Sequence, residues 1–429
     1  MKKAWSSKYG WYVILLLAQL QSCRREELRR IPELRTIGAS REGATITVTG
    51  EILDLGNGVF QHGHCWAEDK IPDISDSTTQ LGVASRTGEF ISSISIERGK
   101  EIFVRAYLAT ESGVLYGESM SISFPHWERM ADPPWEGRFD AISFKIGNYG
   151  YIGMGRKRRV ELGGESMLSD FWRFDPTNDT WERLMDFGPG PRAGTIGFAI
   201  GNKAYIGGGF GHRSSARQED WWEYDSELDL WTQKTDPPFF EWYGEEPVAF
   251  SIGDKGFVGL LERINSGDAG FWEYNQFSDQ WTQRSFPEAR TSIGGIGVSA
   301  LGKGYVLFGF DNQFSSSDGG LEDISKEVWE YDPATDQWTR KADFPGQNRM
   351  YPHLIPAGNK FYVGHGDLRD RDLWEYNPEN DSWTQLEGVS TNQELFKGIA
   401  FELKGRVYIG AGIVGHSPYN ENEFWKYTP

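Results

Sequence analysis

The chain has 429 residues, of which 18 are Trp and 52 are Gly, and this composition argues against a disordered chain, a coiled coil or a helical bundle. Its 62 acidic and 44 basic residues give a net charge of −18, which repels nucleic acid and anionic lipid, so we expect no nucleic-acid partner. Only two cysteines are present, Cys23 and Cys65, which excludes a disulfide framework and a thiolate-rich metal site.

The first 22 residues predict a signal peptide. A basic start precedes an apolar run over residues 11–20, which is too short to span a bilayer as a helix. The run ends in Leu20-Gln21-Ser22-Cys23, which resembles the lipobox of bacterial lipoproteins. This resemblance implies that Cys23 is the lipidated first residue of the mature protein and that residues 23–33 are an anchor and linker. The alternative is a plain signal peptide with an incidental cysteine.

Residues 24–27, two arginines and two glutamates, resemble the surface-export signal of some Gram-negative lipoproteins. Together with the lipobox, this resemblance implies an outer-membrane protein held by its lipid anchor only. Whether the protein faces the cell surface or the periplasm stays open.

Residues 34–124 predict a small β-domain. Alternating patterns indicate strands over 44–50, 61–67, 102–108 and 120–124, separated by clusters of Gly, Asn and Asp. Several short strands in this length favour a sandwich. The stretches 63–66, 104–107 and 116–117 resemble a fibronectin type III-like spacer of Gram-negative surface lipoproteins.

Three side chains of the second of these strands are candidates for chemistry. Cys65 lies beside Trp66, so we expect a buried and inert thiol. His62 and His64 share one face of the strand. Two imidazoles alone make a poor metal site, so we interpret them as surface residues.

A repeat fills the rest of the chain. Pairs of tryptophans nine residues apart, such as Trp172 and Trp181, enclose an Asp-Pro-x-x-Asp type of turn, in which we expect the Asp side chains to bond local backbone amides. The leading tryptophan recurs about every 50 residues, which is typical of kelch-type propellers. The leading positions are Trp172, Trp222, Trp272, Trp329, Trp374 and Trp425. The resemblance to the kelch family covers residues 125–429 and implies a β-propeller with six blades.

The sixth repeat is cut short at residues 424–429, and its missing tryptophan stands at the other end of the unit. Residues 126–132 match 180–186, so Trp127 should supply the outer strand of the last blade. We therefore predict that strand 125–130 pairs with 424–428, which removes an exposed sheet edge. The predicted fold is all-β: a six-bladed kelch β-propeller preceded by a small fibronectin type III-like β-sandwich.

Four arginines recur before the predicted innermost strands, at Arg138, Arg192, Arg290 and Arg349. A ring of arginines at the mouth of the propeller would grip carboxylates or sugar hydroxyls. The alternative is that each arginine pairs with an acidic residue of the adjacent blade. Because a residue present in most blades usually serves the blade, the recurrence favours this second interpretation.

Loop residues that do not follow the repeat are the other ligand-binding candidates, because the scaffold does not account for them. Aromatic platforms with arginines nearby suit a sugar or a peptide. The alternative is a solvated charge run at 156–159 and local hydrophobic plugs elsewhere. The candidates are Arg158, Arg213, Trp242, Tyr243, Arg263 and Arg369.

Two enzymes of the kelch family set the catalytic alternatives. Galactose oxidase uses copper with a Tyr–Cys cross-link, and no cysteine follows Cys65, so that cofactor is excluded. The histidines look scattered, without metal-ligand spacing, and we expect no metal and no other cofactor. N-acetylneuraminate epimerase is a secreted six-bladed kelch protein, which leaves a sugar mutarotase or epimerase as an alternative. Its acid or base would be Glu241, Glu245 or Glu246.

The sequence thus predicts a membrane-anchored lipoprotein that acts as a binding module through its propeller loops, with no assigned catalytic residue. The expected ligand is a glycan, a peptide or a neighbouring outer-membrane or cell-surface protein. Besides the epimerase-like enzyme, a structural accessory subunit of an outer-membrane complex is the remaining alternative.

Overall fold

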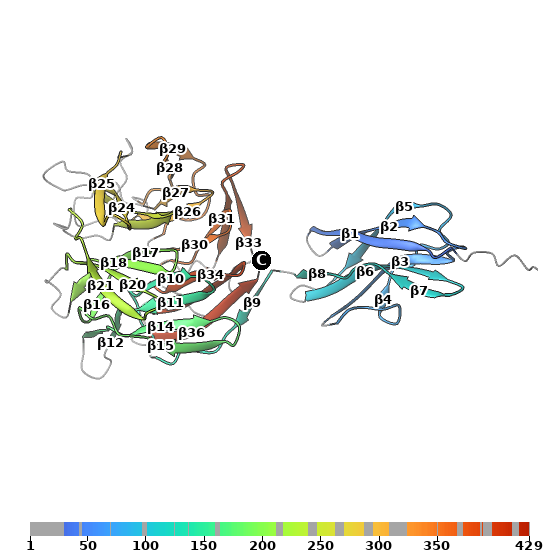
Figure 1. Cartoon of the computed structure of the whole chain (residues 1–429), viewed down its shortest axis with the longest axis horizontal. Coiled ribbons are helices and arrows are strands. Elements are labelled where there is room, and N and C mark those ends of the chain that lie inside the picture. The colour runs from blue at the N-terminus through green and yellow to red at the C-terminus, as the bar shows by residue number, and fades with distance from the viewer. Residues whose placement is uncertain are drawn as a thin grey trace, which may run out of the picture. The chain divides into compact units, whose positions relative to one another are not determined.

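The computed structural model divides the chain into two compact units, Met1–Phe124 and Pro125–Pro429 (Figure 1). The regular structure of the described residues is made of strands, and every ladder is antiparallel, so the prediction of an all-β fold is confirmed. Among the residues that the structure describes, no helix is long and apolar enough to cross a membrane. The structure describes residues 30–42, 45–68, 70–96, 101–123, 125–135, 137–158, 164–211, 218–238, 247–261, 270–286, 295–308, 324–349, 351–366, 372–386, 388, 397–413 and 420–428.

The N-terminal unit consists of two antiparallel sheets that share an apolar core. Ile46, Val48 and Ile94 of the first sheet pack against Ile102 and Val104 of the second. The first sheet contains β1 (Glu33–Glu42), β2 (Thr45–Asp54) and β5 (Gly88–Ser95). The second contains β4 (Ser77–Thr78), β3 (Gln61–Glu68), β6 (Glu101–Thr110), β7 (Gly113–Tyr116) and β8 (Met120–Ser123). β1 therefore begins at the last residue that the sequence assigned to the linker.

Two of the β3 side chains singled out in the sequence are buried in this core. Cys65 is a free cysteine, and its burial raises the pKa of the thiol, so the expectation of a buried thiol is confirmed. The expectation of an exposed His64 is wrong, because β5 of the facing sheet covers it. Its Nδ1 lies 2.7 Å from the Ser92 hydroxyl, its ring packs on Phe90, and burial lowers its pKa to about 4. His62 is half-buried, with Nδ1 2.7 Å from the Gly82 carbonyl oxygen.

The described residues of the C-terminal unit form six four-stranded sheets, numbered here sheet 1 to sheet 6. In sheets 1 to 5 the chain runs through four neighbouring strands in order, whereas the fourth strand of sheet 6 comes from the start of the unit. The first strands are β10 (Ile142–Ile146), β17 (Ile196–Ile200), β22 (Val248–Ile252), β26 (Ile296–Ala300), β30 (His353–Ala357) and β34 (Ile399–Leu403). The second strands are β11 (Tyr149–Gly153), β18 (Lys203–Gly207), β23 (Lys255–Leu261), β27 (Lys303–Leu307), β31 (Lys360–Gly364) and β35 (Arg406–Ile413).

The leading tryptophans lie in the third strands, and the second tryptophans lie in the fourth. The third strands are β14 (Phe171–Asp175), β20 (Trp221–Asp225), β24 (Gly270–Asn275), β28 (Val328–Asp332), β32 (Leu373–Asn377) and β36 (Asn420–Thr428). The fourth strands are β15 (Thr180–Arg183), β21 (Leu230–Lys234), β25 (Gln280–Gln283), β29 (Gln337–Lys341), β33 (Ser382–Leu386) and β9 (His126–Arg129).

Sheet 6 joins the two ends of the unit. β9 pairs with β36 in antiparallel register, with Trp127 opposite Tyr427 and their ring centroids 5.0 Å apart. The first strands of successive sheets contact each other in order, and β34 of sheet 6 contacts β10 of sheet 1 (Figure 1). Contacts among the first strands therefore form a complete cycle.

The two acidic positions of the repeated turn have different roles. The first accepts hydrogen bonds from local backbone amides, as Asp175 does from the Thr177 N–H at 2.8 Å, which confirms the expected turn chemistry. The second was expected to act locally as well, and this is wrong. Asp279 of sheet 3 accepts the Thr235 N–H of sheet 2 at 3.1 Å, and Trp281 Nε1 donates to the Thr235 carbonyl oxygen at 2.9 Å. The backbone N–H and C=O of one residue of sheet 2 are thus both bonded by sheet 3.

This arrangement, which we call the Asp–Trp latch, recurs around the unit. Asp and Trp of one sheet bond the N–H and C=O of a single residue in the preceding sheet. The complete latches hold Met185 (Asp229, Trp231), Thr235 (Asp279, Trp281), Ser285 (Asp336, Trp338) and Ala342 (Asp381, Trp383). Asp179 makes the amide half of the latch with Ala131.

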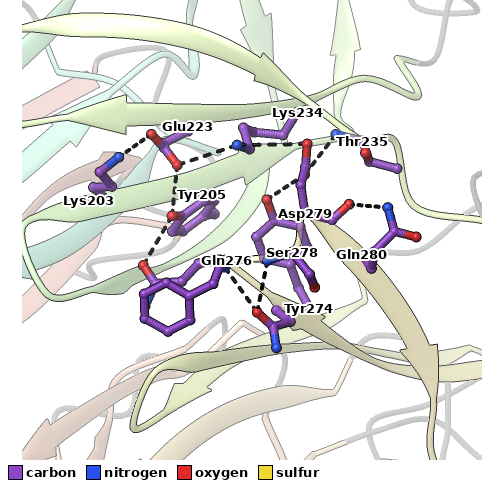
Figure 2. Close-up of polar contacts among 12 residues, drawn as sticks. Lys203, Tyr205, Glu223, Lys234, Thr235, Tyr274, Gln276, Ser278, Asp279 and Gln280 are labelled. Atoms are coloured by element: carbon purple, nitrogen blue, oxygen red, sulfur yellow. Dashed lines mark hydrogen bonds and ion pairs between the residues drawn. The ribbon is translucent and has the colours of Figure 1, made fainter.

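A chain of charged and hydroxyl groups surrounds the latch carboxylate between sheets 2 and 3, as Figure 2 shows. Tyr274 donates its hydroxyl to Asp279 Oδ1 at 2.7 Å, and Lys234 lies 3.7 Å from Oδ2 and 3.9 Å from Glu223. Burial alone would raise the pKa of Asp279, but the bonds from Tyr274 and Thr235 and the charge of Lys234 hold it below its usual value. The carboxylate is therefore ionised at neutral pH.

Sheet 1 offers a direct test of the latch, because it has Phe174 where four other sheets have the latch tyrosine. We expect Phe174→Tyr to supply the missing hydroxyl to Asp179 and to raise the free energy of unfolding by about 1 kcal/mol. Tyr224→Phe should lower it by a similar amount, because it removes the 2.8 Å bond to Asp229. Urea unfolding of the full chain measures both, and a Phe174→Tyr variant less stable than the unchanged chain would contradict the role of the hydroxyl.

Candidate functional site

One end of the C-terminal unit holds the recurring arginines that the structure describes. Ile142 at the start of β10 pairs with Gly153 at the end of β11, so the segment before a first strand and the loop after a second strand emerge together. We call this the loop end. The chain enters the unit from the other end, since β9 runs from its first residue towards the loop end.

Three of the four recurring arginines are buried at the loop end. Arg138, Arg192 and Arg349 are 1 %, 2 % and 0 % exposed. Arg192 holds both carboxylate oxygens of Asp220, at 2.6 and 3.0 Å, and also donates to the Gly208 carbonyl oxygen. Arg138 pairs in the same way with Asp170, and Arg349 with Asp372.

These arginines serve the scaffold rather than a ligand. The expectation that each of these arginines forms an ion pair is confirmed. The expected partner is wrong, because the aspartate belongs to the same sheet and not to the adjacent one. The reason is topological, because the residues before the first and third strands of one sheet lie at the same end. Burial alone would raise the pKa of Asp220, but Arg192 and the Trp222 indole hold it below its usual value. The buried guanidinium groups thus neutralise partly buried carboxylates of their own sheets.

The sequence contained a signal for these pairs that the repeat analysis missed. An aspartate stands two residues before the leading tryptophan in the three sheets whose arginine is buried. The other sheets have Gly270, Glu327 and Glu423 at that position. Arginine and aspartate therefore occur together within single repeats of the same chain.

Of the remaining sequence candidates, only Arg158 lies among the residues that the structure describes. Arg158 lies in β12 (Arg156–Arg158), where its backbone pairs with Glu165 of β13 (Glu165–Met167). The others lie outside the described residues: Cys23, Arg213, Glu241, Trp242, Tyr243, Glu245, Glu246, Arg263, Arg290 and Arg369.

A different set of residues gathers at the loop end, two positions before the first strands. Asp140, Gly194, Tyr351 and Lys397 occupy this position in sheets 1, 2, 5 and 6, and all four have a left-handed backbone, with φ of 51°, 63°, 52° and 51°. Glycine adopts this conformation freely, whereas a tyrosine or lysine is held there at a cost of about 1 kcal/mol or more. The three non-glycine residues therefore occupy a backbone position that glycine fits better.

Their side chains meet around one buried carboxylate. The Asp140 side chain is 3 % exposed, and it lies 2.6 Å from Arg156 Nη2 and 2.8 Å from Lys397 Nζ. Lys397 Nζ also lies 4.0 Å from the centroid of the Tyr351 ring, which is a cation–π contact. We call Asp140, Arg156, Tyr351 and Lys397 the axial cluster. It joins sheets 1, 5 and 6.

Arg156 connects the axial cluster to the hairpin of β12 and β13. Its Nη1 lies 2.5 Å from Glu165, and its guanidinium lies over the rings of Phe139 and Phe210 at 4.6 and 5.2 Å. Burial alone would lower the pKa of Arg156, but the charges of Asp140 and Glu165 outweigh it and raise the pKa. Arg156 therefore stays charged at neutral pH.

Two histidines at the loop end of sheet 5 lie side by side, although the sequence suggests that the histidines are scattered. His353 and His365 are both buried, with ring centroids 5.7 Å apart, and burial lowers the pKa of His353 to about 4. The described part of the chain nevertheless holds no group of three or more potential metal ligands.

Sequence reasoning did not find Asp140, Tyr351 or Lys397, and it noted Arg156 only within a basic run. These residues share no type, so they become comparable only once the starts of the first strands are known. Comparison with known proteins adds no assignment: no family model matches the chain, and no curated protein matches its sequence.

The buried ion pairs predict a pH-dependent stability difference. Asp220→Asn should lower the free energy of unfolding at pH 7 by about 3 kcal/mol, because it leaves the Arg192 charge buried without a counterion. The pKa of Asp220 is lower in the folded protein, so the stability it confers is present above the unfolded pKa of about 4 and is lost as pH falls through the folded pKa. The deficit of the variant should therefore shrink in acid.

The matched control is Asp186→Asn, which breaks the exposed pair with Arg183 and should change the free energy by about 0–1 kcal/mol. Urea titrations of the full chain between pH 3 and 7 measure both variants. Equal effects of the two substitutions at pH 7 would contradict the structural role of the buried pair.

Proposed function

We propose that the C-terminal unit is a six-bladed kelch-type β-propeller and that the N-terminal unit is a fibronectin type III-like β-sandwich. The six four-stranded sheets, the cycle of contacts among their first strands and the pairing of β9 with β36 support the first part. The shared core of two antiparallel sheets supports the second. In this architecture, each blade is one repeat and the loop end is one face of the propeller.

We propose further that the chain is a membrane-anchored binding protein, and that it binds its ligand at the loop end over the axial cluster. The observation that carries this proposal is the convergence of Asp140, Tyr351 and Lys397, which all occupy a left-handed position suited to glycine. Unfavourable backbone conformations of this kind concentrate at functional sites, where the side chain is needed.

The contrast between repeated and unrepeated charges supports this choice of site. The repeated arginines are used within their own sheets, and no ligand is needed to explain them. The axial residues differ from sheet to sheet, so the repeat does not account for them. Charged groups, a half-buried aromatic ring and a rigid surrounding scaffold are what a glycan or a peptide of the cell envelope would require.

The proposed location rests on the lipobox resemblance at Cys23 and on the charged residues that follow it. An acyl chain on Cys23 would hold the protein on the outer membrane, and the N-terminal unit would serve as a spacer. A neighbouring outer-membrane or cell-surface protein is then a further possible source of the bound peptide or glycan.

Ligand binding by the axial cluster is testable with two lysines that flank one strand. Lys397 precedes β34 and Lys404 follows it, with φ of 51° and 53°, so both sites have the same backbone conformation. The full chain in detergent is screened for a rise in melting temperature with glycan and peptide libraries, and a ligand at 100 times its Kd should stabilise by about 2.7 kcal/mol. Lys397→Gln should reduce the affinity at least tenfold, and Lys404→Gln should leave it unchanged.

Binding that is insensitive to Lys397→Gln would place the ligand elsewhere on the protein. Co-purification with a single membrane protein from solubilised outer membranes, unaffected by Lys397→Gln and without any shift by glycans or peptides, would instead favour the accessory-subunit alternative.

A further inference from the structure

The chain enters and leaves the N-terminal unit at opposite ends of its two sheets. It enters at Arg30, which bonds Asp54 and Asn57 at the end of β2 and in the turn that follows. It leaves after β8, whose last residue, Ser123, pairs with Glu101 at the start of β6. The far end of β6 pairs with the start of β3, which follows the turn that Arg30 contacts. We call the end that holds Arg30 the entry end and the opposite one the exit end.

Three large apolar side chains are exposed at the entry end. Ile31, Phe60 and Val83 are 77 %, 57 % and 71 % exposed. Ile31 follows the residue that bonds the turn after β2, and Phe60 directly precedes β3. Val83 lies beside the same start of β3, because the Ala84 N–H next to it donates to the Val59 carbonyl oxygen at 3.2 Å. We call Ile31, Phe60 and Val83 the apolar tip.

The backbone that carries the apolar tip is fixed by packing. Each residue of the tip has a neighbour in the chain that is buried or half-buried, namely Pro32, Val59 and Ala84. Val59 and Ala84 belong to the apolar core at this end, together with Ile52. Pro32 packs so closely on Gly56 that a Cβ on this glycine would lie 2.6 Å from the proline Cδ. The exposed apolar side chains therefore project from a rigid base.

The residue that is proposed to carry the acyl chain is close to the entry end along the sequence. Seven residue steps lead from Cys23 to Arg30, and an extended chain covers at most about 25 Å over this length. An acyl chain in a bilayer therefore keeps the entry end within that distance of the lipid. Apolar side chains gathered on a surface mark a contact with a protein or a membrane, and the bilayer is the surface that the anchor brings within reach.

We propose that the apolar tip docks on the bilayer, with Ile31, Phe60 and Val83 inserted between the headgroups and the acyl chains. This inference rests on the proposed membrane anchor and adds a second contact with the same membrane. Binding to this interface increases with the apolar area that is buried there, so the tip reinforces the acyl anchor. A net charge of −18 disfavours contact with anionic lipid, so the docking depends on apolar side chains and not on charge. The exit end then points away from the bilayer.

The same unit supplies a matched control at its other end. Ile71 is 63 % exposed and follows the end of β3, whereas Phe60 precedes its start. The eight residues of β3 span about 26 Å, so the two positions report on different ends of one unit. Neither native cysteine competes for a thiol-reactive label, because Cys65 is buried and Cys23 carries the acyl chain under the proposal.

Phe60→Cys and Ile71→Cys, each with a nitrobenzoxadiazole label, test the docking in the full chain. Each variant is reconstituted in phosphatidylcholine vesicles, and flotation measures whether the protein is bound. Label emission at position 60 should rise about threefold on vesicle binding, and lipid with a nitroxide near its headgroup should quench it by about half, because the label enters the interface. Position 71 should show neither change. Raising the salt from about 0.1 to about 0.5 M should not alter these results, because salt screens only charge.

The outcomes separate the docking from the anchor. Protein that floats while position 60 remains as exposed to water as position 71 would overturn the docking and leave the anchor intact. A rise in emission without quenching by the nitroxide lipid would assign the tip to a protein contact, such as a second copy, and a signal lost in salt would assign it to charged groups. Either result would also overturn the docking. Protein that does not float would overturn the anchor and the docking together.

Discussion

The architecture of the C-terminal unit depends on how one sheet is attached to the next, since neighbouring sheets share no backbone ladder. Burial of apolar side chains supplies most of the contact, and this effect is non-directional. The Asp–Trp latch adds direction, because a carboxylate and an indole must bond the N–H and the C=O of the same residue, such as Thr235. Each latch therefore gives a backbone N–H and a backbone C=O their partners and fixes one sheet to the next.

Charge is used in two ways at the loop end. Arg138, Arg192 and Arg349 recur with the sheets, and each forms an ion pair with an aspartate of its own sheet. Asp140 and Lys397 do not repeat, and they connect different sheets at positions whose backbone conformation suits glycine. The separation of the two groups is the physical basis for assigning scaffold roles to the first and a binding role to the second.

The sequence predicts the all-β class, the positions of the repeats and the pairing of 125–130 with 424–428, because tryptophans nine residues apart mark two adjacent strands. β9 and β36 pair over His126–Arg129 and Trp425–Thr428. The partner of the second aspartate was beyond sequence reasoning, because a local turn bond and a bond to another sheet use the same residue type. The axial cluster was also beyond it, since Asp140, Tyr351 and Lys397 share a backbone conformation and no chemical pattern. His64 shows a third limit, because alternation on β3 does not reveal which face the opposite sheet covers.

Amide hydrogen exchange at the four latched residues tests the central claim most directly. The N–H groups of Met185, Thr235, Ser285 and Ala342 belong to no ladder within their own sheets and point to a carboxylate of the next sheet. If the latches hold the sheets together, NMR should show these amides exchanging as slowly as those of the first strands. Exchange at the rate of exposed turn residues, such as those between β22 and β23, would show that the sheets are not joined in this way.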